Sequence, residues 1–172
     1  QRSVNLGQVL PLAQHFRGTA VTLRFIEFMD VGATNGWRMD EVVPSQDLVA
    51  LIHEAHPIHA LEKQYAGEVA QRWQYADAQA GWGELGFISS VTQAFCGDCS
   101  RLRLSTNGQL FTCLFAQQGW DVRSLLRDAA VDDAHIASRF AALWRQRGDQ
   151  YSAKRTAQTT ALPKVEMSFI GG

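Results

Sequence analysis

All three cysteines of this 172-residue chain lie in one short stretch, FCGDCSRLRLSTNGQLFTCLF, which covers residues 95 to 115. Cys96 and Cys99 form a Cys-x-x-Cys pair, and Cys113 follows later in the same stretch. Three thiolates can hold three corners of a 4Fe–4S cluster and leave the fourth iron open, whereas closed structural zinc sites normally have four protein ligands. The spacing therefore indicates a metal or cluster site with an open position.

Two arginines lie between the second and the third cysteine. Residues two apart in a strand point to the same face, so Arg101 and Arg103 would share one face and Leu102 the other. Guanidinium groups bind phosphate oxygens in a bidentate manner, and the pair could therefore hold a phosphorylated substrate beside the cysteines. The alternative is a solvated arginine face with Leu102 and Leu104 in the core, and spacing alone does not separate these two interpretations.

Zinc is a second interpretation of the cysteines, because three thiolates and one imidazole also make a common zinc site. The chain contains His53, His56, His59 and His135, but none of them lies at a ligand-like spacing from the Cys-x-x-Cys pair. Inert buried thiols are a weaker alternative, since chance seldom gathers all cysteines of a chain into one stretch. Clustered cysteines in an odd number favour metal binding in a reducing compartment over disulfides.

The amino-acid composition restricts which classes of protein and of binding partner remain possible. The chain has 46% hydrophobic and 19% charged residues, which is typical of a globular protein. A formal net charge of -1 gives no overall field that would attract nucleic acid or an anionic membrane surface. No secretory leader and no apolar run of about 20 residues is found, so we expect a soluble, cytoplasmic protein that binds neither nucleic acid nor membrane.

The first third of the chain predicts elements that could position such a site. Residues 9–17 could form a helix, Val21–Met29 reads as a strand, and Ser45 is expected to cap a helix. The buried stripe of that helix would be Leu48, Leu51 and Ile52. A strand, a long loop and a helix make a β/α unit, and in barrels of such units functional groups follow the carboxyl ends of strands. Glu27, Met29 and Asp30 fall there.

The pattern changes after residue 56 to short strand-like segments, predicted at Phe87–Val91, Arg101–Ser105 and Leu110–Phe115. Asn107 and Gly108 are expected to form a type I′ hairpin turn, which pairs Arg103 with Thr112 and Leu102 with Cys113. That register places Cys113 on the leucine face, so we predict a bulge or twist near Cys113. Further helices should begin near Asp121 and at Asp132 or Asp133, and residues 165–169 alternate as in a strand.

The predicted fold class is therefore α/β to α+β, with two parts. Residues 1–55 would be the end of an incomplete (β/α) barrel, and residues 56–172 a small α+β domain that carries the cysteines.

Four elements in this order resemble one known family: the strand LRFIEFMDVG followed by NGW, the segment GELGFISSV, the cysteine stretch, and the terminal FIGG. The chain resembles, over essentially its whole length, the C-terminal portion of the molybdenum cofactor biosynthesis protein A family, the radical SAM GTP 3′,8-cyclases. The resemblance implies a lyase reaction in which S-adenosylmethionine is the radical source for cyclisation of GTP to 3′,8-cyclo-GTP.

The resemblance also implies roles for individual residues. Cys96, Cys99 and Cys113 match the ligands of a second, auxiliary 4Fe–4S cluster to whose open iron GTP binds. Arg101, Leu102 and Arg103 match the GTP-contacting segment. Met29 matches a methionine that contacts S-adenosylmethionine, and Gly171 and Gly172 match a tail that reaches into the active site. Homodimers are common in the family, so a homodimer is expected.

One departure from the family pattern has consequences for activity. The family carries a CxxxCxxC motif for a first 4Fe–4S cluster in its N-terminal half, and this chain lacks it. We therefore expect a truncated enzyme that is inactive alone and has the missing N-terminal half of the barrel as its natural partner. Ser100 stands where asparagine is common in the family. The alternatives are an auxiliary-cluster domain of another radical SAM enzyme and a zinc-binding module.

Overall fold

The computed structural model describes residues 1–79, 81–156, 160 and 162–170. The chain divides into two compact units, one made of Gln1–Met29 and Trp37–Cys99 and the other of Asp30–Gly36 and Ser100–Gly172. The polypeptide thus leaves the first unit at residue 30, returns at residue 37 and leaves again after residue 99. The functional division at residues 55 and 56 stays a prediction.

The first unit is built on a four-stranded mixed sheet in the order β1-β4-β3-β2. Its strands are β1 (Leu23–Ile26), β2 (Ile58–Ala60), β3 (Gln71–Tyr75) and β4 (Glu84–Ile88). The edge strand β1 runs parallel to β4, with Leu23 opposite Leu85 and Ile26 opposite Ile88. The pairs β3–β4 and β2–β3 are antiparallel.

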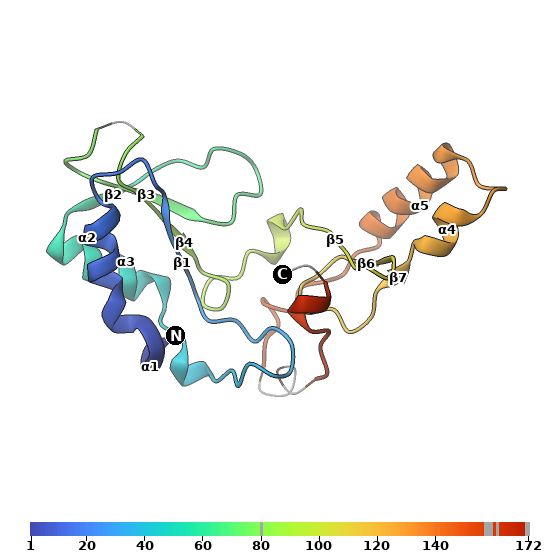
Figure 1. Ribbon diagram of the computed structural model, residues 1–172, viewed down its shortest axis with the longest axis horizontal. Coiled ribbons are helices and arrows are strands. Elements are labelled where there is room, and N and C mark those ends of the chain that lie inside the picture. Colours follow the sequence, from blue (N-terminus) through green and yellow to red (C-terminus); the bar gives the residue numbers. More distant parts are fainter. Residues whose placement is uncertain (80, 157–159, 161, 171–172) are drawn as a thin grey trace. The chain divides into compact units, whose positions relative to one another are not determined.

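Helices α2 (Val9–Phe16) and α3 (Ser45–Ala55) provide the other side of the core of the first unit, and Figure 1 shows them beside the sheet. The core consists of apolar side chains from both helices, from the sheet and from the loop before α3: Val9, Ala13, Val43, Leu48, Ile52, Ile58, Tyr75, Leu85 and Phe87. The remaining short elements of this unit are α1 (Arg2–Asn5) and the 3-10 turns η1 (Leu6–Gln8), η2 (Met39–Glu41) and η3 (Cys96–Asp98).

The second unit contains a three-stranded antiparallel sheet in the order β5-β6-β7. Its elements are β5 (Arg103–Leu104), β6 (Gln109–Phe111), β7 (Trp120–Asp121), α4 (Arg123–Arg127), α5 (Asp133–Arg145) and the 3-10 turn η4 (Met167–Phe169). Two separate sheets accompanied by few helices make an α+β fold, so the α+β part of the predicted fold class is confirmed.

Helix predictions agree with the structure where a capping residue could be read from the sequence. Asp132 accepts a hydrogen bond from the backbone N–H of His135 at 2.7 Å and caps α5, as short polar residues do at helix starts. The Asp121 carboxylate accepts the N–H of Ser124 at the start of α4. Ser45 begins α3 instead of capping it, and its side chain bonds to Glu27.

Two predicted strands are shorter or displaced. The strand predicted at Val21–Met29 is confined to Leu23–Ile26, because its parallel partner β4 ends at Ile88. The strand predicted at Phe87–Val91 lies at Glu84–Ile88, because the N–H groups of Val91 and Thr92 bind the Glu27 carboxylate instead of a neighbouring strand.

The C-terminal alternation of residues 165–169 was a misleading signal. Met167–Phe169 form a 3-10 turn, in which the N–H of Phe169 bonds to the carbonyl of Glu166 at 3.0 Å. The expectations for Gly171 and Gly172 lie outside the described residues. Within the part of the chain that the structure describes, no helix is long and apolar enough to cross a membrane.

Candidate functional site: the cysteine turn, the arginine strand and two buried carboxylates

The Cys-x-x-Cys pair lies on a single 3-10 turn in the first unit. Cys96 begins η3, and the N–H of Cys99 donates to the carbonyl of Cys96 at 3.4 Å. The turn covers Cys96–Asp98, and Cys99 follows it in an extended conformation, so the two cysteines flank one short turn. Both cysteines are half-buried, which suits a pair of ligands that faces a bound group.

Glu27 holds the loop between β4 and this turn. Its carboxylate lies directly after β1 and is only 4% exposed. Oε2 accepts the N–H groups of Val91 and Thr92, each at 2.8 Å, and Oε1 accepts the Thr92 hydroxyl at 2.6 Å. Thr92 lies four residues before Cys96, so this carboxylate fixes the start of the cysteine turn.

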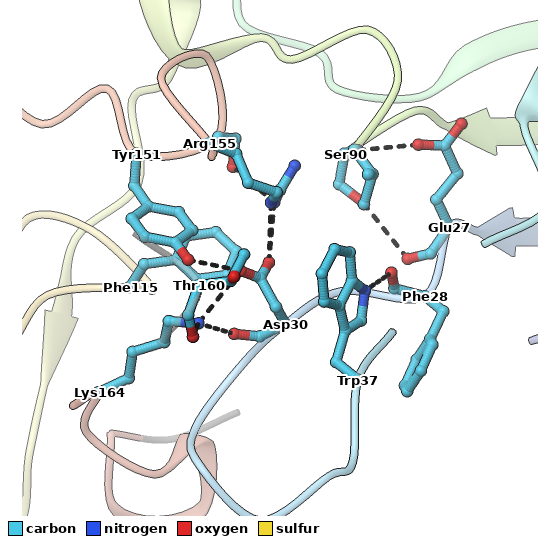
Figure 2. A network of polar contacts seen from close by, with 12 residues as sticks. Glu27, Phe28, Asp30, Trp37, Ser90, Phe115, Tyr151, Arg155, Thr160 and Lys164 are labelled. Carbon is cyan, nitrogen blue, oxygen red and sulfur yellow. Dashed lines mark hydrogen bonds and ion pairs between the residues drawn. The ribbon is translucent and has the colours of Figure 1, made fainter. Parts of the chain in front are cut away.

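Glu27 also joins this loop to α3. Its Oε1 atom accepts the backbone N–H of Ser45 at 2.9 Å and the Ser45 hydroxyl at 3.1 Å. The Ser90 hydroxyl donates to the Glu27 backbone carbonyl at 3.4 Å, as Figure 2 shows. Burial alone would raise the pKa of Glu27, but hydrogen bonds from Thr92, Ser45 and Val91 lower it below its usual value. The carboxylate is thus held in its charged form.

Three segments meet at Glu27: the end of β1, the start of α3 and the loop before the cysteines. Met29 follows two residues later in the same unit and is half-buried. The Trp37 indole N–H donates to the carbonyl of Phe28 at 2.7 Å (Figure 2). Met29 thus directly follows Phe28, whose carbonyl is held by the Trp37 indole.

The hairpin that carries the arginines has a different turn from the one predicted. Gly108 has a φ of 82°, but no residue other than glycine has a positive φ in the described chain, which excludes a type I′ turn at Asn107–Gly108. Instead Ser105 and Gln109 close a three-residue loop: the Ser105 N–H bonds to the Gln109 carbonyl at 2.9 Å, and the Gly108 N–H to the Ser105 carbonyl at 3.0 Å.

The longer turn shifts the register of the hairpin by one residue. Arg103 is paired with Phe111 and Leu104 with Leu110, whereas the prediction paired Arg103 with Thr112. Continuing the observed register would set Cys113 opposite Arg101. The extra residue therefore lies in the turn, and the predicted pairing of Arg103 with Thr112 and of Leu102 with Cys113 is wrong.

Instead of the bulge or twist predicted near Cys113, the structure has a strand end before it. The strand β6 ends at Phe111, and Cys113 lies in a turn that follows it. The N–H of Ala116 donates to the Cys113 carbonyl at 3.3 Å, and the N–H of Phe115 to the Cys113 sulfur at 3.5 Å. Cys113 is half-buried, like the other two cysteines.

The leucines beside the arginines do not belong to the core. Leu102 is 42% and Leu104 59% exposed, whereas the solvated-face alternative needed both of them buried. Arg103 is half-buried and faces the same side as the buried Phe111. Arg101, in contrast, is exposed, so only one of the two arginines is partly covered by other groups of the protein.

Asp30 is the centre of a second buried cluster, which lies in the second unit (Figure 2). Its carboxylate accepts the Tyr151 hydroxyl at 2.5 Å, Arg155 Nε at 3.0 Å and Lys164 Nζ at 3.1 Å. The Arg155 and Lys164 side chains are 8% and 3% exposed. Two buried cations around one carboxylate are unusual, because burying a charge is costly unless it is well paired.

The same loop has a second contact to the C-terminal segment. The Glu166 carboxylate accepts the N–H of Ala33 at 2.9 Å and the hydroxyl of Thr34 at 3.2 Å. Gly32 has a φ of 65°, and a Cβ at this position would lie 2.2 Å from Glu166 Oε2. Loop 30–36 thus packs closely against the Glu166 side chain.

The predicted site residues divide between the two units. Cys96, Cys99 and Met29 belong to the first, whereas Arg101, Leu102, Arg103 and Cys113 belong to the second. Within either unit, the described residues contain no group of three or more histidine, cysteine, aspartate or glutamate side chains placed to hold a metal ion. A joint site of the three cysteines stays a prediction.

Sequence reasoning missed the partners of Asp30. The position of Asp30 after a strand was a usable signal, but Tyr151, Arg155 and Lys164 lie in a stretch without periodicity. The cation pair could only be found once the fold had brought it to Asp30.

Together the fold and these residues define an α+β protein with a half-buried cysteine pair and a buried Glu27 in one unit, and a third cysteine after an arginine-bearing hairpin and a buried Asp30 in the other. Comparison with known proteins gives a definite assignment. Residues 21–153 match the family model Molybdenum Cofactor Synthesis C, and the chain belongs to this family.

Relatives named GTP 3′,8-cyclase match the chain over its full length. The protein from Xanthomonas axonopodis pv. citri is 51% identical over 172 residues, which is 50% of that protein. The relative from Acidothermus cellulolyticus is 43% identical, with 53% of its length covered, and that from Staphylococcus epidermidis 40% identical, with 51% covered. The chain spans about half the length of the curated relatives it matches.

Proposed function

We propose that this chain supplies the auxiliary-cluster and GTP-binding part of a GTP 3′,8-cyclase of molybdenum cofactor biosynthesis. The observation that carries the proposal is the full-length match to relatives of that name, 51% identical in one case, by a chain whose three cysteines all lie in the matched region. The alternatives are the auxiliary domain of another radical SAM enzyme and a zinc module.

Cys96, Cys99 and Cys113 would hold a 4Fe–4S cluster. The donor set suits this group: three half-buried thiols, two of which flank one short 3-10 turn. When bound, the cluster supplies an open iron to which a purine can attach. Glu27 would keep the cysteine turn in position, as supporting residues around metal ligands do.

Arg101 and Arg103 would bind the anionic part of GTP. In support, Arg103 is paired with Phe111, two residues before Cys113. Guanidinium groups at such a site orient a phosphorylated substrate by bidentate hydrogen bonds. Leu102 would complete the contact segment, Met29 would contact S-adenosylmethionine, and Gly171 and Gly172 would form the active-site tail.

The finer organisation belongs to the same proposal. Residues 1–55 would be the end of an incomplete (β/α) barrel and residues 56–172 the auxiliary-cluster domain. In this proposal the chain alone is inactive, because none of its cysteines could form the CxxxCxxC that holds the first 4Fe–4S cluster. An N-terminal half would be its partner, in a homodimeric cytoplasmic enzyme.

Anaerobic reconstitution with iron and sulfide tests the proposal. About four irons and four sulfides per chain, and an electron paramagnetic resonance spectrum that changes on addition of GTP, are the expected results. Arg103→Ala should remove the GTP response while leaving the metal content and the unfolding temperature unchanged. Zinc uptake without sulfide, or an Arg103→Ala variant that unfolds at lower temperature yet binds GTP normally, would contradict it.

A further inference from the structure

We propose that the C-terminal segment, anchored by Asp30, is the support that positions Cys113, with Asp149 and Tyr151 as its positioning residues. The inference rests on the proposed function, since it gives a structural basis to the third ligand of the proposed cluster. All residues involved belong to the second unit.

The first contact lies on the N-terminal side of Cys113. The hydroxyl of Thr112 donates a short hydrogen bond to Asp149 Oδ2, and the same carboxylate oxygen lies 3.7 Å from Arg147 Nε. Thr112 is buried, so its hydroxyl depends on this partner. The residue directly before Cys113 is therefore tied to residue 149.

The second contact lies on the C-terminal side of Cys113. The Phe115 ring stacks on the Tyr151 ring, with a centroid distance of 4.5 Å and an interplanar angle of 20°, and Figure 2 shows the two rings against each other. The N–H of Phe115 donates to the Cys113 sulfur at 3.5 Å. The residue that contacts the thiol is thus held by an aromatic pair, an interaction that adds to plain burial.

A third contact closes the turn. The N–H of Val165 donates to the carbonyl of Ala116 at 3.4 Å, while the N–H of Ala116 donates to the carbonyl of Cys113. The residues before and after Cys113 are therefore bound by two stretches of the C-terminal segment, 149–151 and 165. Together they fix the backbone that carries the thiol.

Asp30 holds both stretches in place. It accepts the Tyr151 hydroxyl, pairs with Arg155 at 2.9 Å, and pairs with Lys164, the residue before Val165. The Arg155 guanidinium also lies over the Phe115 ring, 5.7 Å from its centroid. Buried ion clusters are a poor source of stability compared with apolar packing, so a role in fixing one geometry explains this cluster better.

Support of this kind matters for a metal ligand. The residues around the ligands of metal sites orient them, and their replacement commonly lowers metal affinity without unfolding the protein. If this is the role of Tyr151, its removal should change the reactivity of the Cys113 thiol and leave the reactivities of Cys96 and Cys99 unchanged.

Thiol alkylation of the metal-free 172-residue chain tests this directly. The chain is treated with iodoacetamide under reducing, anaerobic conditions, and mass spectrometry follows each cysteine separately. We expect Tyr151→Ala to raise the alkylation rate of Cys113 about tenfold, since opening of the turn becomes easier. Tyr151→Phe, which keeps the stacked ring, should raise it less than about threefold. Asp132→Ala, which removes the cap of α5 in the same unit, is the matched control and should leave Cys113 unchanged.

Equal acceleration at all three cysteines, or the same acceleration of Cys113 in Asp132→Ala, would overturn the inference. If Tyr151→Ala does not fold, Thr112→Val takes its place with Thr112→Ser as the conservative variant. A second readout is iron and sulfide content after reconstitution, expected to fall in Tyr151→Ala and to be retained in Tyr151→Phe. If the unaltered chain takes up no iron or sulfide, the proposed function fails, while the alkylation rates still decide whether the segment positions Cys113.

Discussion

Glu27 and Asp30 are three residues apart in the chain and are both buried carboxylates, but their partners differ. Glu27 accepts hydrogen bonds from neutral groups, including the N–H groups of Val91 and Thr92. Asp30 is surrounded by the cations Arg155 and Lys164. Neutral donors and charged donors both favour the ionised carboxylate. Because the donors differ, we expect Glu27 and Asp30 to respond differently to substitution.

Glu27→Gln should lower the free energy of unfolding by about 1–3 kcal/mol, because the amide cannot accept from both sets of donors and leaves a buried N–H without its partner. Urea unfolding at neutral pH measures this change. Glu54→Gln, at an exposed position of α3, is the control and should change stability by less than about 0.5 kcal/mol. Equal stabilities of the two variants would contradict the importance of the Glu27 hydrogen bonds.

The Asp30 cluster predicts a loss of stability in acid. Burial raises the pKa of Asp30, but hydrogen bonds from Tyr151, Arg155 and Lys164 and the charge of Arg155 lower it below the ordinary value of 3.8. A carboxyl whose pKa is lower in the folded state stabilises the fold fully above its unfolded pKa and loses this contribution as the pH falls through the folded pKa.

Urea unfolding between pH 6 and pH 2 checks this prediction. The unaltered chain should lose part of its free energy of unfolding below about pH 4. In Asp30→Asn this part of the pH dependence should be absent, and the variant should already be less stable at pH 6 by about 3–5 kcal/mol, the usual effect of removing one partner from a buried ion pair. A variant with the same acid profile as the unaltered chain would be inconsistent with this assignment.

Sequence patterns could identify residues whose chemistry is local. The cysteine spacing and the arginine alternation stand out within 21 letters, and Asp30 was recognisable as a polar residue after a strand. The sequence could not show that Tyr151 and Lys164 reach Asp30, because contacts over more than 120 residues depend on the fold and not on spacing. The ionised state of Glu27 likewise depends on donors from two distant segments, at Ser45 and at Val91 and Thr92.

At the level of elements, the hairpin between β5 and β6 shows where prediction from turn residues is limited. Asn-Gly is the strongest short signal for a two-residue turn, yet the structure has a three-residue loop with only Gly108 at positive φ. The hydroxyl of Ser105 accepts the N–H of Gln109 at 3.0 Å. This side-chain bond stabilises the longer loop and so sets the register in which β5 and β6 pair.

Gly108→Ala should destabilise the chain by more than about 1 kcal/mol, because alanine is strained at positive φ. A Cβ at this position would also lie 2.5 Å from the Cβ of Arg123. Thermal unfolding measures the effect. Gly148→Ala is the matched control, since a Cβ there meets nothing within 4 Å, and it should be neutral within about 0.5 kcal/mol. Similar unfolding temperatures for both variants would show that the turn tolerates a side chain.

Strand boundaries were the least predictable elements. The patterns predicted β1 and β4 in nearly the right places, but each strand ends where the other ends, and pairing partners cannot be read from one segment. Helices were more predictable because their signals are local. The cap of α5 at Asp132 is an example, since it depends on a residue only three positions away.

For the whole molecule, the proposed function predicts that activity needs residues beyond these 172. The chain alone should not convert GTP in the presence of S-adenosylmethionine and a reductant. Fusion to the N-terminal half of the Xanthomonas axonopodis relative, which is 51% identical over the shared half, should give a cyclase, and its product can be measured by mass spectrometry. The same fusion with Cys113→Ala is the control and should be inactive. Activity of the unfused chain would contradict the proposal that catalysis requires an N-terminal half.

Loop 30–36 belongs to the second unit, and this has a consequence for folding during synthesis on the ribosome. Asp30 leaves the ribosome 134 residues ahead of Lys164, which at about 5–20 residues per second is on the order of ten seconds. During that time the first sheet can form, since β1 and β4 are both complete by residue 88. The Asp30 carboxylate cannot yet pair with Lys164. Closure of the second unit must therefore follow the synthesis of Lys164, long after the first sheet has become able to form.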